Sequence, residues 1–564
     1  MIKSVKDLLT ELRTKNINLF LTEEEELEVV SYKEKISSNL VQEIKEQKES
    51  IIDYLKSHKE ESIPRIQLVE KSENYVLSSA QKSLWLISQS VRASIAYNMP
   101  SSTTLKGINN VSFLKKAIES VIDRHEILRT VFKQDLTGEI KQVVLDRSDS
   151  GFKIDFQDFC NEKNQEAKIN SFIEQDSMKS FDLEKGPLLR VNLFHISKDN
   201  YVLSYNMHHI IGDGWSMEVL DKEVRSFYQA YESNTAVNLP ELNFQYKDYA
   251  AWEYNQLEKG KMQEHKEYWL NSFASELPVL NLPSSLIRPK LKTYNGHCLR
   301  AYIPSAEVQH LKRIVQSERG TLFMGFLAVL KILIYKYTSE RDIIIGSPIV
   351  NRAEFELKNQ IGFYIKTLAL RNQLNVEDSF INFFQKLREN TLSAFKHQDY
   401  PFEKLVTDLN ITRDISRSPI FDISITYHNT SSSHNEIIFD KDCYKIESAG
   451  NISCKNDIEF HFQEVGDYMS FNVNYNSDVY DRGMIEKFIL NYKHLLSVIL
   501  DNPKENIKNI NFLSQAERQQ LLEEFNDTAA AYPKDKTIID LFEEQADRTP
   551  NNIAVVFEGK ELTY

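Results

Sequence analysis

The sequence predicts a multidomain α/β protein, and three observations support this prediction. From Tyr75 to about Leu513, patterns typical of helices and of strands alternate along the chain. Within that region a β-prone run from Tyr201 to Met207 leads through glycines into a stretch with helical periodicity, Met217 to Tyr231. The chain has 564 residues, which is more than one ordinary domain holds and suits roughly two to four domains.

The first 62 residues predict a small unit of helices around a β-hairpin. We expect an amphipathic helix over 5–12, strands over 17–21 and 27–30, an acidic hairpin tip over 22–26, and a second helical region over 40–55. Two interpretations stay open: an extension packed on the main body, or a docking module that captures an extended peptide by strand addition. Residues 63–74 are charged, contain Pro64 and are interpreted as a linker.

Composition excludes several classes of protein. The formal charge is −14, from 68 Lys and Arg against 82 Asp and Glu, whereas a general nucleic-acid binder needs a basic face. The most apolar stretch, 322–335, is interrupted by Lys331 and is too short to span a bilayer, so we interpret it as a buried helix. The N-terminus lacks the uninterrupted apolar core of a signal peptide. We therefore expect a cytoplasmic protein with neither a membrane nor a nucleic-acid partner.

The cysteines Cys160, Cys298, Cys443 and Cys454 are scattered without paired spacing. This pattern indicates neither a disulfide framework nor a zinc site, and a reducing compartment follows as the expectation. Their sequence context offers no base partner, so we expect small buried apolar side chains rather than nucleophiles.

Two further segments are predicted to be irregular. Residues 430–435, which include three consecutive serines, predict a surface loop. After Leu513 we expect a linker over 526–533 and a strand over 553–557, and the sequence stops shortly afterwards at Tyr564. The chain therefore looks cut rather than finished.

The informative motif is His208-His209-Ile210-Ile211-Gly212-Asp213-Gly214, at the end of the expected strand. Side chains alternate along a strand, so the two histidines are expected on opposite faces and cannot easily share a metal. Asp213 could fix the local geometry or orient an imidazole, and Gly214 would let a substrate approach the backbone closely. Such a strand end in an α/β protein is a common position for a functional site.

Other chemistries are not supported by motifs. The segment around Ser216 lacks the second glycine of a nucleophile elbow, so this serine is a weak candidate nucleophile. The sequence also contains no glycine-rich phosphate loop of the mononucleotide or dinucleotide type.

The chain resembles the condensation domain of nonribosomal peptide synthetases over nearly all of residues 75–515, because seven segments match the core motifs of that family in order. The seven are 77–85 (LSSAQKSLW), 124–132 (RHEILRTVF), 207–216 (MHHIIGDGWS), 246–252 (YKDYAAW), 361–368 (IGFYIKTL), 397–406 (HQDYPFEKLV) and 413–421 (RDISRSPIF). Two positions depart from the family pattern: Lys366 stands where the fifth motif usually has Asn, and Gly212 where Ser is common. We assign no role to Lys366.

The resemblance implies a fold and a division of the chain. We expect two chloramphenicol-acetyltransferase-like lobes in a V-shaped pseudo-dimer, an N-lobe over 75–250 and a C-lobe over 251–515, with a tunnel between them. It further implies that Asp213 is structural and pairs with an arginine, for which Arg352 is the candidate, and that His208 is structural. Residues 1–62 resemble N-terminal docking domains that bind the C-terminal tail of an upstream synthetase subunit. Residues 516–564 resemble a linker and the truncated start of an adenylation domain.

The function that the resemblance implies is peptide-bond formation between two carrier-bound substrates. The donor and acceptor carrier proteins bring their thioesters on phosphopantetheine arms, and no metal or intrinsic cofactor is required. We expect His209 to accept a proton or to position the acceptor amine, and the Gly214 amide to hold the donor carbonyl or oxyanion. The motif favours an L-configured donor. The alternatives are a D-donor or dual epimerising condensation domain, and a non-catalytic scaffold that only docks carriers.

Overall fold

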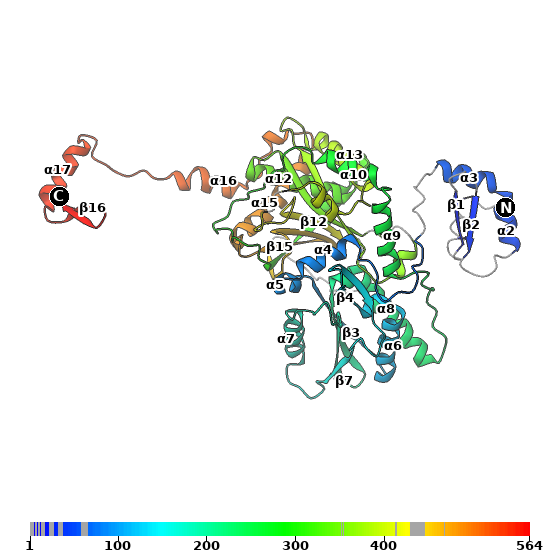
Figure 1. The fold of residues 1–564 in the computed structure, drawn as a ribbon. Coiled ribbons are helices and arrows are strands. Elements are labelled where there is room, and N and C mark those ends of the chain that lie inside the picture. Colours follow the sequence, from blue (N-terminus) through cyan, green and yellow to red (C-terminus); the bar gives the residue numbers. More distant parts are fainter. Residues whose placement is uncertain are drawn as a thin grey trace. The chain divides into compact units, whose positions relative to one another are not determined.

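The computed structural model describes residues 17–21, 27–31, 38–57, 66–350, 352, 355–411, 414–428, 446–466 and 468–564, together with Val5, Leu8 and Leu12. The chain folds as one unit up to Ile510 and a second unit, Asn511–Tyr564. Figure 1 shows the order of the elements along the chain. The predicted hairpin tip at 22–26 and the predicted loop at 430–435 lie outside the described residues.

The N-terminal segment contains the predicted hairpin and helices. Strands β1 (Ile17–Leu21) and β2 (Leu27–Ser31) pair in antiparallel fashion, and α2 (Ser38–Glu46) and α3 (Lys48–Ser57) follow. Val5, Leu8 and Leu12 are helical, as their spacing predicts. A small core of aliphatic side chains joins these elements; it is made of Leu8, Leu12, Leu19, Leu40, Ile44 and Ile51.

The N-terminal lobe is built on a four-stranded sheet with the order β3-β8-β7-β6. Its strands are β3 (Asn98–Leu105), β8 (Asn200–His208), β7 (Leu189–Ser197) and β6 (Ile154–Asp158); only the β6–β7 pair is parallel. Helices α6 (Val111–Arg124) and α8 (Gly214–Ser233) pack against each other, and α7 (Gln165–Ser177) contacts β3 and β8 (Figure 1). The predicted strand over 201–207 and the predicted helix over 217–231 are thus confirmed as parts of β8 and α8.

Shorter elements complete this lobe. They are α4 (Ser79–Ile87), α5 (Val91–Ile95), η1 (Glu126–Arg129), η2 (His209–Ile211) and the hairpin of β4 (Thr130–Gln134) and β5 (Ile140–Val144). Helix α4 begins where Ser78 accepts a hydrogen bond from the Gln81 amide and Gln81 bonds back to the Ser78 amide, a capping box.

The C-terminal lobe is built on a mixed seven-stranded sheet with the order β11-β10-β12-β14-β15-β9-β13. These strands are β9 (Asn295–Pro304), β10 (Asp342–Val350), β11 (Ile365–Gln373), β12 (Ile423–His428), β13 (Glu447–Ser453), β14 (Ile458–Val465) and β15 (Tyr468–Asn476). Its helices are α11 (Ser305–Ser317), α12 (Leu322–Thr338), α13 (Phe380–Lys396), α14 (Phe402–Asp408) and α15 (Arg482–Asp501), with short 3-10 turns η3 (Phe355–Asn359) and η4 (Ile507–Asn509).

Helix α12 is the buried apolar helix that the sequence predicts. Lys331 in its middle is fully buried, and its Nζ donates to the carbonyls of Ile343, at 2.8 Å, and Leu370, at 2.6 Å. In the described part of the chain no single helix is long and apolar enough to cross a bilayer; α11 and α12, bent by 101° at their break, pass that test only as a pair.

Helices α9 (Tyr246–Glu258) and α10 (Gln263–Ser272) follow the N-terminal lobe, and the predicted lobe boundary at 250–251 falls inside α9. The unit Asn511–Tyr564 holds α16 (Gln515–Leu522), η5 (Glu524–Asn526), α17 (Ile538–Arg548) and a hairpin of β16 (Ile553–Phe557) and β17 (Lys560–Thr563). The strand predicted over 553–557 is confirmed.

Candidate active site

The histidine motif forms the turn between strand β8 and helix α8. The strand ends at His208, His209 begins the 3-10 turn η2, and Asp213 is the N-terminal cap of α8. The expectation that the two histidines lie on opposite faces relies on strand alternation, and that alternation stops before His209, because the backbone turns directly after His208. The turn lies at the C-terminal end of β8, where the sequence places the candidate site.

His208 is fully buried and held from both ring nitrogens. Nδ1 accepts a hydrogen bond from the Ile210 amide at 3.2 Å, so the ring proton is on Nε2, which lies 3.4 Å from Ser88 Oγ and 3.5 Å from Ser94 Oγ. The ring meets Phe181 edge-on. Burial, together with nearby positive charges, lowers the pKa of His208 to about 3. These contacts give His208 a structural environment.

His209 is held as the opposite tautomer. Its Nδ1 lies 3.0 Å from the Gly212 carbonyl, which only accepts hydrogen bonds, so Nδ1 carries the proton and Nε2 keeps a lone pair. The His209 amide donates to the Tyr97 carbonyl at 2.9 Å, and the ring packs edge-on against Phe363 and Tyr97. Burial and the nearby Lys455 charge lower the pKa of His209 well below its usual value. The imidazole is therefore neutral near pH 7.

Asp213 and Arg352 form a buried ion pair. Arg352 Nη2 lies 2.9 Å from Asp213 Oδ1 and 3.1 Å from Oδ2. Asp213 Oδ1 also accepts from the Ser216 amide and hydroxyl, at 2.8 and 2.7 Å, and Oδ2 accepts from the Tyr364 amide at 3.1 Å. The structure thus brings together the two residues that the family resemblance pairs.

Asp213 does not contact the imidazole of His209. Its two oxygens are used by Arg352, Ser216 and the Tyr364 amide, and the ring of His209 is oriented by the Gly212 carbonyl instead. The alternative in which Asp213 orients the imidazole is therefore wrong. The cap geometry is the cause, because it turns the carboxylate toward the start of α8.

The two glycines of the motif serve different purposes. A Cβ at Gly212 would come within 2.3 Å of Met207 Sδ and 3.3 Å of Ser216 Cβ, so this position needs the absence of a side chain. A Cβ at Gly214 would meet nothing within 4 Å. Gly214 is exposed and is the first residue of α8, so the open space at its missing side chain lies beside the first turn of that helix.

Ser216 is a structural residue. It is fully buried, and its hydroxyl bonds to Asp213 Oδ1 at 2.7 Å and to the Gly362 carbonyl at 2.9 Å. The Asp213 carboxylate is itself paired with Arg352, and the hydroxyl is buried, which agrees with the interpretation that Ser216 is a weak candidate nucleophile.

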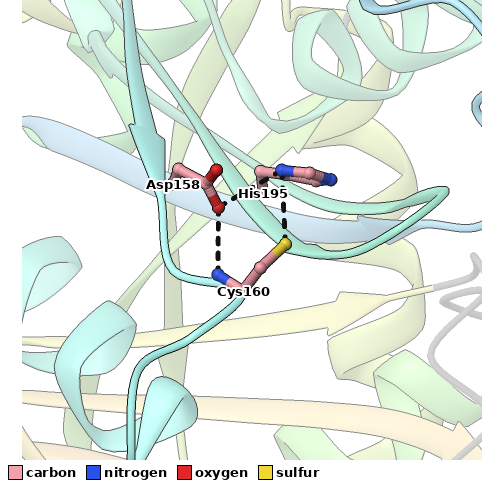
Figure 2. A group of neighbouring side chains, drawn as sticks. All are labelled: Asp158, Cys160 and His195. Atoms are coloured by element: carbon pink, nitrogen blue, oxygen red, sulfur yellow. Dashed lines mark hydrogen bonds and ion pairs between the residues drawn. The ribbon is translucent and has the colours of Figure 1, made fainter.

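Cys160 differs from the expectation of a buried thiol without a base partner. Its side chain is half-buried, and Sγ lies 3.3 Å from Nδ1 of His195, beside Asp158 (Figure 2). This neighbour could not be predicted from spacing along the sequence, because His195 is 35 positions away from Cys160. Cys298 and Cys454 are buried free thiols, as expected.

Several residues near the motif carry no sequence signal of their own. Tyr97 contacts the ring of His209, and Lys455 Nζ lies 5.0 Å from the centre of the Tyr97 ring. Burial lowers the pKa of Lys455, although Glu459 opposes this. Both residues come from segments distant in sequence from the motif, so only the folded chain brings them to His209.

The unusual lysine of the fifth motif has a defined partner. Lys366 Nζ lies 2.6 Å from Glu253 Oε1, and Glu253 Oε2 accepts from the Ser79 amide at 2.7 Å. Burial by itself lowers the pKa of Lys366, but the Glu253 carboxylate outweighs this and raises it. Lys366 in β11 is thereby joined through Glu253 in α9 to the first turn of α4.

The chain has two α/β lobes that are joined by a buried ion pair, and a neutral histidine lies at a strand end next to that pair. This arrangement defines the chloramphenicol-acetyltransferase-like fold class that the sequence predicts. Residues 71–522 match the condensation-domain family, and residues 5–57 match the TubC N-terminal docking domain. The chain belongs to the condensation-domain family of nonribosomal peptide synthetases, with an N-terminal docking domain.

The relatives are synthetases many times longer than this chain. Gramicidin S synthase 2 of Brevibacillus brevis is 35% identical over 517 residues, which are 92% of this chain and 11% of that protein. Bacitracin synthase 2 of Bacillus licheniformis is 33% identical over 576 aligned residues, covering 100% of this chain and 21% of that protein. The chain therefore spans only a small part of the length of these relatives.

Solved structures share the fold at low sequence identity. The X-domain from teicoplanin biosynthesis has a TM-score of 0.71 and 22% identity, covering 80% of this chain and 100% of that one. The condensation domain from Monacolin K polyketide synthase MokA has a TM-score of 0.66 and 20% identity, covering 78% of this chain and 100% of that one.

Proposed function

We propose that the chain catalyses peptide-bond formation between two carrier-bound thioesters. The α-amine of the acceptor aminoacyl thioester attacks the donor thioester carbonyl, an amide bond forms, the carbon–sulfur bond breaks, and the donor thiol is released. One observation carries the proposal beyond family membership: His209 is neutral, and the Gly212 carbonyl fixes its proton on Nδ1, so Nε2 is the proton acceptor.

A strong base is not needed for this attack. An α-amine has a pKa of about 7.7–8.0, so a useful fraction is neutral near pH 7. As the nitrogen bonds to the carbonyl carbon it becomes positively charged, and His209 Nε2 takes the proton and passes it to the leaving thiolate. A base in position typically contributes about 10²–10⁴-fold to the rate. If His209 only aligns the amine, proximity supplies the acceleration and the loss on mutation is smaller.

We propose that the Gly214 amide holds the donor carbonyl as it becomes an oxyanion. This amide is the first of helix α8, and the first amides of a helix have no partner within the helix. The helix dipole adds partial positive charge there, which favours an anionic oxygen. Open space at the missing Cβ lets the substrate reach the backbone.

The wider assignment follows from the same family. We propose an upstream donor and a downstream acceptor carrier protein as partners, each delivering its substrate on phosphopantetheine, so that the condensation chemistry needs no intrinsic cofactor. Residues 1–62 would bind the C-terminal tail of an upstream subunit, and residues 516–564 would lead into an adenylation domain. We propose an L-configured donor and a cytoplasmic location, on the sequence grounds given above.

The test is single-turnover condensation read by intact-protein mass spectrometry. Two carrier proteins charged with donor and acceptor aminoacyl groups are mixed with the wild-type chain, with His209→Ala, or with His310→Ala as a matched histidine control in α11. We expect dipeptide on the acceptor carrier with the wild type and with His310→Ala, and a rate lower by about 10²–10⁴-fold with His209→Ala.

Each alternative gives a different result. Equal rates for His209→Ala and the wild type would exclude any catalytic role for His209 and leave positioning of the substrates by the rest of the site as the source of the acceleration. No product with any chain, although both carriers are fully loaded with L- or D-donors in parallel, would favour a carrier-docking scaffold. Product from the D-donor alone would identify a D-donor domain.

A further inference from the structure

A cluster of three potential metal ligands lies at the edge of the N-terminal sheet, outside the candidate active site. Strands β6 and β7 run parallel, and their register sets Asp158 directly beside His195. Asp158 Oδ1 and Cys160 Sγ each lie 3.3 Å from His195 Nδ1, and all three ligand atoms lie within 4.8 Å of one another (Figure 2).

The three side chains converge on a single point. A nucleophile that is activated by a histidine and a carboxylate uses the two opposite ring nitrogens for its two partners. Here both Cys160 and Asp158 meet the same nitrogen, Nδ1 of His195, so that relay cannot operate. Sulfur, nitrogen and oxygen donors facing one point are instead the arrangement of a metal site.

The spacing suits a tetrahedral ion. With the usual zinc–ligand bond lengths, tetrahedral angles place an imidazole nitrogen about 3.4 Å from a carboxylate oxygen and about 3.6 Å from a thiolate sulfur. The observed distances from His195 Nδ1, 3.3 Å to Asp158 Oδ1 and 3.3 Å to Cys160 Sγ, are close to these two expected separations. An ion can therefore enter with only small movements of the side chains.

The cluster is held in place by its surroundings. Gln165 Nε2 at the start of α7 donates to the carbonyls of Phe159, at 2.7 Å, and Ile196, at 3.1 Å, which clamps the two ligand-bearing segments together. The Phe159 amide donates to the His195 carbonyl at 2.8 Å, and the His195 ring stacks on Tyr201 with centres 4.7 Å apart. Ring orientation and segment spacing are thus fixed before any ion binds.

The local charge also favours a cation. Within the described part of the chain, the ion-pair partner of Asp158 is His195, and no lysine or arginine neutralises this carboxylate.

We propose that Asp158, Cys160 and His195 bind a divalent transition-metal ion. Their donor atoms favour zinc, and the fourth coordination position is open to water. Thiolate, imidazole and carboxylate together suit zinc, and the half-exposed Asp158 side leaves the site accessible to solvent. Binding displaces the thiol proton of Cys160 and moves the ring proton of His195 from Nδ1 to Nε2. Nε2 is buried without a partner among the described groups, so we expect weaker binding than at a site whose histidine is supported.

The ion would stabilise this edge of the lobe rather than take part in condensation. His195 pairs with Tyr201 near the start of β8, whereas His208 ends that strand. Seven residues of extended strand separate them, about 23 Å. A metal there crosslinks the loop after β6 to β7 and does not reach the reacting thioesters.

Cobalt and zinc binding to the metal-stripped full chain test the proposal. Cobalt(II) should give a near-ultraviolet sulfur-to-metal band and tetrahedral visible bands that saturate at one equivalent, and zinc should displace it. Zinc should also raise the melting temperature. Both effects should be lost in Cys160→Ser and His195→Asn and kept in Cys298→Ser, which removes a buried thiol in β9. Circular dichroism checks the fold of each variant.

Other results would contradict the proposed metal site or its structural role. A wild-type chain that gives no sulfur-to-cobalt band, or a band that persists in Cys160→Ser, would overturn the assignment. The single-turnover condensation rate should be equal with and without zinc; a rate that depends on zinc would contradict the structural role proposed for the ion.

Discussion

Asp213 and Arg352, 139 positions apart in the chain, lie 2.9 Å apart as a buried ion pair. The Arg352 guanidinium also donates from Nη1 to the carbonyls of Leu357 and Gln360, both at 2.6 Å. Because Asp213 caps α8 and follows the histidine turn, the pair fastens that turn to the C-terminal lobe. The pair therefore has consequences for both stability and the position of His209.

Breaking this pair should be costly. Arg352→Met leaves the Asp213 carboxylate buried without a counterion, which should lower the free energy of unfolding by about 3–5 kcal/mol. The double variant Asp213→Asn with Arg352→Met should lose less than the sum of the single variants, with a coupling of about 0.5–3 kcal/mol. Urea unfolding followed by tryptophan fluorescence measures all four proteins. Additive losses would mean that the two side chains are not coupled.

The fold should tolerate Lys366 at its buried position only while Glu253 is present to pair with it. Replacing it with the residue usual in the family, Lys366→Asn, removes the cation beside the buried Glu253 carboxylate and should cost about 3–5 kcal/mol. Glu253→Gln with Lys366→Asn exchanges both ions for neutral amides that can still hydrogen-bond, and should recover most of that loss. The same unfolding measurements decide this; an Lys366→Asn variant as stable as the wild type would show that the pair is not needed.

The residues of the histidine motif lie close together along the chain, and their place in the fold could be predicted from the sequence. His208, His209, Asp213 and Gly214 follow one another, so a strand-then-helix pattern was enough to place them at a strand end. Arg352 came only from the family resemblance, because no local pattern distinguishes one arginine at the end of a strand from another.

The remaining contacts depend on the course of the folded backbone. The carbonyl that orients His209 belongs to Gly212, and this becomes evident only when the backbone leaves the strand at His208. The partner of Lys366 lies 113 positions away at Glu253, and His195 meets Cys160 through the parallel pairing of β6 and β7. Spacing rules detect neighbours within one element, and none of these pairs shares an element.

The two glycines of the motif should separate stability from activity. Gly212→Ala puts a Cβ against Met207 and should destabilise the fold by about 1–3 kcal/mol. Gly214→Ala meets no neighbour, so its unfolding should match the wild type, while the added methyl group obstructs the approach of substrate and lowers the condensation rate. Unfolding and single-turnover rates are measured on both variants. A Gly214→Ala chain as active as the wild type would show that substrate does not approach through the open space at the missing Cβ of residue 214.

The burial of His208 should make stability depend on pH. Its folded-state pKa, about 3, is below the usual value near 6.5, so between these limits the unfolded chain binds more protons. The contribution is complete above pH 6.5 and is lost as pH falls toward 3, by about 1.4 kcal/mol per pH unit. His208→Asn should lower stability at pH 7 but show a shallower decline between pH 6 and pH 4 than the wild type and His310→Asn. Equal slopes in urea unfolding across this range would contradict the buried neutral state.

The neutral state of His209 should also shape the pH dependence of condensation. Because burial holds the pKa of His209 well below its usual value, the ring remains a base throughout pH 6–8, and of the two reacting groups the acceptor amine is the one that titrates there. The logarithm of the single-turnover rate should therefore rise with a slope of one up to the pKa of the amine and then level. A fluorine substituent on the acceptor lowers the pKa of its amine. The inflection of the rate profile should then move to lower pH by as much as the amine pKa falls. A slope of two below pH 6.5 that returns to one in His209→Ala would instead mean that the histidine titrates at its ordinary pKa, and would overturn the tautomer and protonation state on which the proposed base depends.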